Sequence, residues 1–585
     1  KTVYTVRAAA VGVFAATLLL TGCASIPTSG SVHSAEQAAG SDTGIQQDVQ
    51  FYPEPPADGA SAEQIVRGFL DASGAVEPAL AGQPDFATAR KYLASDDPKD
   101  WQPGNDIQIY DGSPQLAPPR TVTSHSDEQI DFEVEPAGTI DSRGTYTPAS
   151  PGKATKHYTF DLVKVKGQRR IDRPLALLLI SKSNFDREYE SLNLYFFDPS
   201  SKFLVPDPIY LAKRADRATL LVRGLLQGPS YWLSSAVEPA FPSGVKLTQR
   251  GVRVVGGQAV VDLSKPAGLA TRDQQNRFGA QLVRTLAQLQ ISSVTVTVEG
   301  KASPLTDLEV DKVVTPPPEP DAYGLRDGAL YALPSIGTDD ARAPEKIAGR
   351  LGSQIKLVDF AVQPGSGPGT AATIAGIDDQ TQPKLYIAKG ALDPAQVKMP
   401  ARHLESPTWD RAGRLWVIDQ RRGRSAIVVI DQHLRWQEVT AADIADRSLT
   451  VQAIAVSEDG TRLALVTTDP QGRREAQIAT VEGSVLTGLR SLAPGLSKAT
   501  DVAWRGPAEL VILGTQQNGQ LQPYLVSVDG SQLAPQGTVE NPLSVTATRN
   551  RPILVGTRPK ELWAQSGGGT WERVDQNIAA PRYPG

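Results

Sequence analysis

The sequence is poor in the residues that build metal, redox and nucleophilic sites. Its 585 residues include one cysteine and five histidines, so no disulfide can form within the chain. The histidines are scattered, and no pair has the i, i+4 spacing of a metal-binding helix, which argues against a zinc site. No G-x-S-x-G elbow for a serine nucleophile occurs either. We therefore expect no metal, no cofactor and no catalytic residue, and predict that the protein is not an enzyme.

An excess of basic charge is also missing. The net charge of −5 argues against a nucleic-acid partner, which would require a positive field. The same balance leaves no polybasic patch for anionic lipid, so attachment to a membrane must come from acyl chains. A hydrophobic content of 40% is ordinary for a globular chain, and the length predicts three or four domains.

The apolar run near the start of the chain is too short to span a membrane. Ala8–Leu20 would form roughly 20 Å of helix, whereas the hydrocarbon core is ~30 Å thick. Lys1 and Arg7 precede the run and small residues follow it. This layout is typical of a secretory signal peptide that is removed during export.

The run ends in Leu20-Thr21-Gly22-Cys23, which contains the single cysteine. Small residues let a peptidase approach the backbone, and the thiol can accept a diacylglyceryl group. The four residues match a bacterial lipobox, so the N-terminus resembles that of bacterial lipoproteins. The resemblance implies a signal peptide at 1–22, cleavage between Gly22 and Cys23, and an acylated, palmitate-bearing Cys23 on the extracytoplasmic face of the cell membrane. The alternative is a buried free cysteine beside an ordinary signal peptide.

The next two segments are predicted to be a tether and an α+β domain. Residues 23–59 are rich in turn formers and lack apolar periodicity, which predicts a flexible tether. In residues 60–190, helical spacing from Ile65 to Leu70 and at Phe86–Leu93 predicts two helices. Alternating segments then predict an antiparallel sheet, with strands at Ile107–Tyr110, Ile130–Val134 and Tyr158–Val163. This order of elements resembles nuclear-transport-factor-2-like domains, in which a cone-shaped sheet wraps on helices.

Residues 191–314 are predicted to form a second α+β domain. Asp216 and Thr271 are candidate N-caps of two helices, and Gly228-Pro229 stops the first of them. Three signals in matching order resemble the GerMN domain of sporulation and spore-germination lipoproteins. They are Leu225-Leu226-Gln227-Gly228-Pro229, Pro242-Ser243-Gly244 and Val261-Asp262-Leu263-Ser264.

A proline-rich linker at 315–320 separates this domain from a repetitive region at 321–585. There an apolar strand, a tight polar turn and a second apolar strand recur, and successive copies begin at Phe360, Trp409, Val456, Trp504 and Ala547. A period in the forties made of strands and turns is typical of four-stranded propeller blades, which must stack to bury both sheet faces. We predict an all-β propeller of five or six blades.

Three further features have a structural interpretation that we favour over a functional one. The cluster Arg421–Arg424 could meet phosphate or an acidic partner, but its position between two strands indicates a hairpin tip. Asp339-Asp340 and Asp378-Asp379 are flanked by turn formers, which favours loop charges over calcium binding or acid–base chemistry. Three tryptophans occupy repeat positions typical of blade core rather than of a sugar-stacking platform: Trp409, Trp416 and Trp504.

The combination of lipobox, tether, α+β domain, GerMN-like domain and propeller, with the segment Cys23-Ala-Ser-Ile-Pro-Thr-Ser-Gly-Ser, resembles the LpqB lipoproteins of actinobacteria over the full chain. That resemblance implies an accessory protein of the MtrA–MtrB two-component system. Such a protein contacts the ectodomain of the sensor histidine kinase MtrB and modulates signalling that controls the cell envelope and division. The alternative is a module that binds peptidoglycan and localises wall enzymes.

Overall fold

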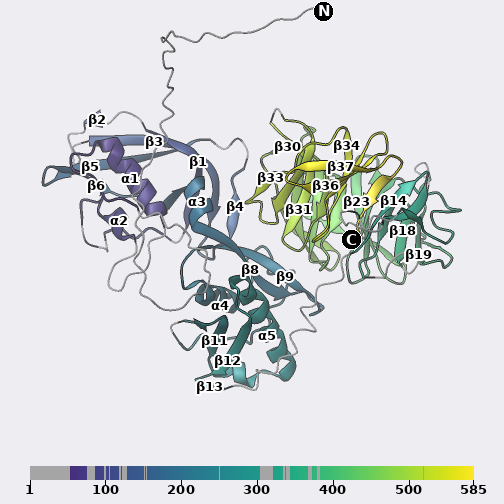
Figure 1. Ribbon diagram of the computed structural model, residues 1–585, viewed down its shortest axis with the longest axis horizontal. Coiled ribbons are helices and arrows are strands. Elements are labelled where there is room, and N and C mark those ends of the chain that lie inside the picture. The colour runs from purple at the N-terminus through teal and green to yellow at the C-terminus, as the bar shows by residue number, and fades with distance from the viewer. Residues whose placement is uncertain are drawn as a thin grey trace, which may run out of the picture.

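The computed structural model arranges the chain as three bodies (Figure 1). It describes residues 53–585 except 76–85, 96, 98–99, 105, 117–119, 122–127, 151, 153, 250, 303–319, 334–335, 337–342, 366–371, 379–381 and 518. The predicted signal peptide and most of the predicted tether lie outside these ranges. Over the described ranges, no helix is both long enough and apolar enough to cross a membrane.

The first body packs helices against a sheet. α1 (Ala62–Gly74) begins with a capping box, because the Ser61 hydroxyl accepts from the Gln64 amide and the Gln64 side chain accepts from the Ser61 amide. Its apolar face, which includes Ile65 and Phe69, is buried, as the spacing predicts. The strands are β1 (Ile107–Leu116), β2 (Arg120–Thr121), β3 (Glu128–Ile140), β4 (Tyr146–Pro148), β5 (Lys156–Val165), β6 (Gln168–Arg173) and β7 (Leu178–Ser181).

Two predictions for this body were wrong in detail. α2 spans only Ala87–Arg90, because Leu93 has left the helix to bridge to Ile171. The sheet is mixed, since its order is β6-β5-β3-β1-β7 and β7 runs parallel to β1. The segment that follows β6 crosses to the opposite edge of the sheet, where β7 lies alongside β1. The Trp101 indole holds this segment by donating to the Leu175 carbonyl at 2.9 Å.

A two-stranded ribbon joins the first body to the second. α3 (Lys182–Glu188) leads into β8 (Tyr189–Phe197), which pairs antiparallel with β9 (Leu204–Ala212). On one side, Tyr210 packs with aromatic side chains of the first body. On the other, Leu194 lies in the core of the second body. The ribbon therefore belongs to both bodies.

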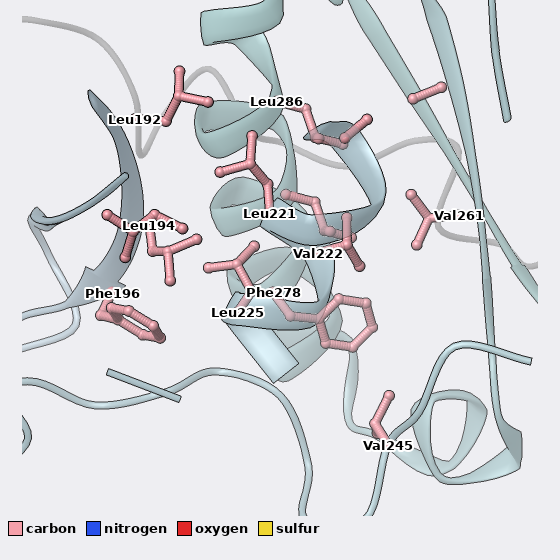
Figure 2. Close-up of a cluster of buried hydrophobic side chains, with 14 of the residues drawn as sticks. Leu192, Leu194, Phe196, Leu221, Val222, Leu225, Val245, Val261, Phe278 and Leu286 are labelled. Carbon is pink, nitrogen blue, oxygen red and sulfur yellow. The ribbon is translucent and has the colours of Figure 1, made fainter. Parts of the chain in front are cut away.

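The second body places two helices on a sheet of order β10-β11-β12-β13. Gly228, with φ of 87°, ends the first helix, and a capping box at Thr271 begins the second, as predicted. Figure 2 shows side chains such as Leu221, Phe278 and Leu194 meeting in one core. The elements are α4 (Arg217–Gln227), β10 (Arg253–Val255), β11 (Gln258–Leu263), the 3-10 turns Lys265–Leu269 and Ala287–Leu289, α5 (Arg272–Leu286), β12 (Ser293–Val298) and β13 (Lys301–Ala302).

The third body is a propeller of six four-stranded blades. Blades two to six use consecutive strands, β17–β20, β21–β24, β26–β29, β30–β33 and β34–β37. The first blade has the order β16-β15-β14-β38, so the last strand of the chain completes it. This closure pairs an edge that would otherwise be free. The sequence left the number of blades at five or six, and the structure gives six.

The propeller strands have the following bounds. Those of the first three blades are β14 (Ala322–Arg326), β15 (Ala329–Leu333), β16 (Glu345–Lys346), β17 (Asp359–Val362), β18 (Thr373–Ile377), β19 (Leu385–Lys389), β20 (Ala395–Gln396), β21 (Leu404–Trp409), β22 (Leu415–Arg421), β23 (Arg424–Ile430) and β24 (Trp436–Glu438). The remaining elements are β25 (Thr440–Ala441), α7 (Ala442–Asp446), β26 (Thr450–Val456), β27 (Arg462–Thr468), β28 (Arg474–Glu482), β29 (Val485–Ser491), β30 (Leu496–Trp504), β31 (Glu509–Gln516), β32 (Gln522–Ser527), β33 (Leu533–Pro535), β34 (Pro542–Thr546), β35 (Leu554–Thr557), β36 (Leu562–Gly567), β37 (Thr570–Asp575) and β38 (Ala579–Arg582).

Candidate functional site: the interdomain joint and the axial cavity

The residues predicted for lipidation and cleavage, Cys23 and Gly22, lie outside the described residues, and so do Asp339-Asp340 and Asp379. Lipidation therefore stays a prediction. Within the described part of the chain, no group of three or more His, Cys, Asp or Glu side chains could hold a metal ion.

The basic cluster forms a hairpin tip, as we favoured. Arg421 pairs with Arg424 where β22 turns into β23. The Arg421 guanidinium donates to Asp419 at 2.7 Å and to Glu438 at 2.9 Å. Arg424 donates to the same Glu438 at 2.8 Å. These two arginines are therefore engaged within their own blade.

Two of the three tryptophans are blade core. Trp409 and Trp416 are 3% and 0% exposed, which confirms the favoured interpretation. Trp504 is different, because its ring packs on a blade core and also lines a cavity. The Trp504 indole donates to the Ala455 carbonyl at 2.9 Å, which fixes the ring between the fourth and fifth blades.

The second body is docked on the propeller through a set of contacts that we call the interdomain joint, formed by Asp207, Tyr210 and Trp232 on one side and Arg462, Arg490 and Ser531 on the other. Trp232 follows α4, and its indole donates to the carbonyl of Gly488 in β29 at 2.7 Å. The guanidinium of Arg490 lies 3.7 Å from the centre of the Trp232 ring. A cation over an indole face is attractive, most strongly when water is excluded.

The joint contains two buried charged side chains, Arg490 and Asp207. Burial lowers the pKa of Arg490 to about 10, although the carboxylates of Asp529 and Asp207 oppose the shift. Burial raises the pKa of Asp207, against hydrogen bonds from Ser230 and the positive charges of Arg490 and Arg143. The Ser230 hydroxyl donates to Asp207 at 2.8 Å. Such charges require fixed partners, so the joint is selective for one docking geometry.

Two further contacts complete the joint. The Tyr210 hydroxyl of the ribbon donates to the Ser531 hydroxyl of the fifth blade at 2.5 Å, and Ser531 donates to Asp529 at 2.6 Å. Arg462, at 0% exposure, donates to Asp459 at 2.7 Å and to the Pro206 carbonyl of β9 at 3.5 Å. The ribbon is thus bonded to two neighbouring blades.

A cavity of about 460 Å³, which we call the axial cavity, lies beside the joint. On one side it is lined by the end of the ribbon, at Phe203 and Leu204, and by Arg284 of α5. The opposite wall comes from all six blades, at the ends of the strands β17, β21, β26, β30, β34 and β38. It therefore lies at the mouth of the propeller axis. Its volume is typical of a small-molecule site.

The repeat pattern contains one signal for this cavity that our prediction did not use. In four of the five repeat copies the third residue follows the end of a strand, and these positions are Arg411, Glu458, Gly506 and Arg549. All four line the axial cavity, because equivalent positions in a ring of blades face the same end of the axis. The ribbon and α5 cover that end from another domain, and no repeat pattern could indicate them.

Replacing Trp232 with alanine is expected to loosen the joint by about 2 kcal/mol, since a packed tryptophan with a satisfied indole is a typical interface anchor. Amide exchange at Ser230–Leu233 and along β29 should then rise about 30-fold. Tyr231→Ala is the matched control, because Tyr231 is 94% exposed and should leave exchange unchanged. Equal exchange in both variants would contradict the assigned role of Trp232.

Models of three families match consecutive parts of the chain. Residues 55–186 match the N-terminal domain of lipoprotein LpqB, residues 332–584 match the LpqB β-propeller domain, and residues 193–304 match a domain described as sporulation and spore germination. Lipoprotein LpqB of Thermobifida fusca is 28% identical over 99% of both chains. That of Streptomyces coelicolor is 29% identical over 97% of this chain and 96% of its own, and that of Mycobacterium tuberculosis is 26% identical over 92% and 91%.

Solved structures resemble single parts of the chain. TolB from Acinetobacter baumannii is 13% identical with a TM-score of 0.36, over 48% of this chain and 73% of its own. The first GerMN domain of GerM from Bacillus subtilis is 20% identical with a TM-score of 0.17, over 19% and 85%. Because both LpqB domain models match in order and full-length relatives align from end to end, the chain belongs to the LpqB lipoprotein family.

Proposed function

We propose that the protein is an extracytoplasmic lipoprotein, held at the cell membrane by an acylated Cys23, that binds the ectodomain of an MtrB-like sensor histidine kinase. Through this contact it modulates two-component signalling that controls the cell envelope and division. It works by binding and carries out no reaction. The lipid anchor confines the folded bodies to a layer near the membrane, which raises their effective concentration toward membrane partners.

The observation that carries the proposal is the interdomain joint. Trp232, Arg490 and Tyr210 hold the second body on the propeller, so the two bodies present their exposed faces in one fixed orientation. A preorganised surface loses less conformational freedom on binding than domains joined by a flexible linker. This favours recognition of a partner that is itself large and folded, such as an ectodomain.

Three buried carboxylates of the propeller have structural partners, which supports a role without catalysis for them. Asp410 accepts from Arg414 at 2.6 Å, Asp419 accepts from Arg421 at 2.7 Å, and Asp459 accepts from Arg462. Each carboxylate holds a turn or strand end in its own blade.

Co-purification from native membranes tests the proposal. We expect the full-length, lipidated chain to recover the sensor kinase, and a chain that lacks 321–585 to lose it. Trp232→Ala should lower the recovery about tenfold, whereas Trp232→Phe, which keeps a ring over Arg490, should retain most of it. An unchanged partner list after deletion would exclude propeller recognition. Strong binding of the soluble 24–585 fragment to purified peptidoglycan, with no kinase recovered, would favour a wall-binding function instead.

A further inference from the structure

The axial cavity carries three guanidinium groups whose charge no neighbour neutralises at contact distance. Arg284, Arg411 and Arg549 all line it. Over the ranges that the structure describes, none of these side chains forms a hydrogen bond or an ion pair. Arg284 instead lies over the Tyr195 ring at 5.0 Å, and Arg411 lies over the Phe203 ring at 4.7 Å.

The remaining charged side chains of the cavity are mostly paired. Arg582 lies 3.4 Å from Asp359, and Asp459 lies 2.7 Å from the buried Arg462. Glu458 is the exception, because it lines the cavity and forms no ion pair with any residue that the structure describes. The Glu458 carboxyl and the α-carboxylate of Gly585, which also lines the cavity, are therefore outnumbered by three guanidinium groups, and the summed charge of the cavity is positive.

The electrostatic environment of Glu458 also indicates positive charge in the cavity. Burial raises the pKa of this carboxyl; Arg411 and Arg549 oppose the rise, and Asp459 adds to it. The two arginines are therefore close enough to act on one group, although neither is bonded to it. An anion placed beside Arg411 and Arg549 would meet the positive field of both guanidinium groups in a partly buried site.

The other walls are apolar and aromatic. Trp504 and Phe203 face the cavity from opposite domains, and Ile454, Tyr583 and Pro407 also line it. Planar rings beside arginines can hold an apolar or aromatic group by stacking. The cavity therefore combines a cationic region with a flat apolar wall.

We propose that the axial cavity binds a small molecule that carries a phosphate or carboxylate group on an apolar or aromatic body. The oxyanion lies among Arg284, Arg411 and Arg549, and the body lies between Trp504 and Phe203. Because Arg284 and Phe203 belong to the second body and the other residues to the propeller, the ligand contacts both sides of the joint. Binding therefore stabilises the docked arrangement by linkage. This inference does not depend on the kinase partner.

A fluorescence titration of the soluble 24–585 fragment with 8-anilinonaphthalene-1-sulfonate tests the proposal, because the probe joins an oxyanion to an aromatic body. We expect saturable binding at one site, displaced by inorganic pyrophosphate if the site prefers phosphate or by citrate if it prefers carboxylate. Arg549→Gln and Arg284→Gln should each weaken the probe about tenfold, since a charge-assisted contact is lost. Arg549 is exposed, so its replacement should leave the fold intact.

Arg422→Gln is the matched control, because Arg422 is an exposed arginine on the β22–β23 hairpin tip. This variant should bind the probe like the parent chain. Absence of saturable binding, unchanged affinity in the Arg284 and Arg549 variants, or displacement by neither anion would each overturn the proposal. Slower amide exchange at Phe203 and at the turn containing Arg411 in the presence of the probe is the second expected result, and unchanged exchange there would place the probe elsewhere and count against the site.

Discussion

Replacing Cys23 with alanine is expected to release the protein from the membrane almost completely while its three bodies stay folded. The net charge of −5 gives no basic attraction to anionic lipid. The proposed anchor is the acyl chains on Cys23, each of which contributes about 0.8 kcal/mol per buried CH₂. Replacing the thiol removes the proposed site of acylation and with it the proposed anchor.

Metabolic labelling with an alkyne fatty acid, followed by membrane fractionation in high salt, measures this effect. Ser25→Ala is the matched control, because it changes a small residue two positions away and leaves the thiol in place. We expect label and membrane retention in the control and neither in the Cys23 variant. Retention of Cys23→Ala in the membrane fraction would show that the protein is held by something other than the predicted lipobox cysteine.

Replacing Arg462 with methionine is expected to destabilise the propeller by about 3–5 kcal/mol, because it leaves a buried carboxylate without its partner. Arg462 is fully buried, lies 2.7 Å from Asp459, and stacks over Trp504 at 5.1 Å. Burial would raise the pKa of Asp459, but Arg462, Thr461 and Ser457 outweigh it and hold the pKa below its usual value. The stability that this carboxylate contributes is therefore present above its unfolded pKa and is lost as the pH falls through the lower folded value.

The thermal midpoint of the propeller transition in the 24–585 fragment measures the Arg462 effect, and we expect a fall of about 10 °C at neutral pH. Arg473→Met is the matched control, because Arg473 also pairs with a nearby aspartate, Asp469 at 2.6 Å, but its side chain is 80% exposed. An exposed pair of this kind contributes little, so the control should melt with the parent chain. Equal thermal midpoints for the two variants would contradict the prediction, because they would show that the buried Arg462–Asp459 pair stabilises the propeller no more than the exposed pair does.

The repeating and capping features of this fold were predictable from the sequence. Helical spacing and caps located α1 and α5, and the repeat of strand, turn and strand predicted the propeller. The short α2 and the parallel β7 were not predictable, because both depend on pairing with Ile171 and β1, which are distant in the sequence. Local patterns report the face and period of an element, while its strand partner is set by the tertiary structure.

Most of the candidate site could not be predicted from the sequence, for a related reason. Arg411 and Arg549 occupy equivalent repeat positions, so their common location was available in principle. Trp232, Arg490 and Arg284 carry no such signal, because each acquires its role only when two domains dock. An isolated tryptophan or arginine in a sequence does not show whether it faces solvent or another domain.

The most direct test of the account is crosslinking in native membranes, followed by identification of the peptides joined to the second body and to the propeller. The account predicts that peptides of both bodies are crosslinked to the same sensor-kinase ectodomain, and that Trp232→Ala reduces the crosslinks from one or both. Crosslinks confined to wall material, or to a membrane protein without a sensor-kinase ectodomain, would contradict it.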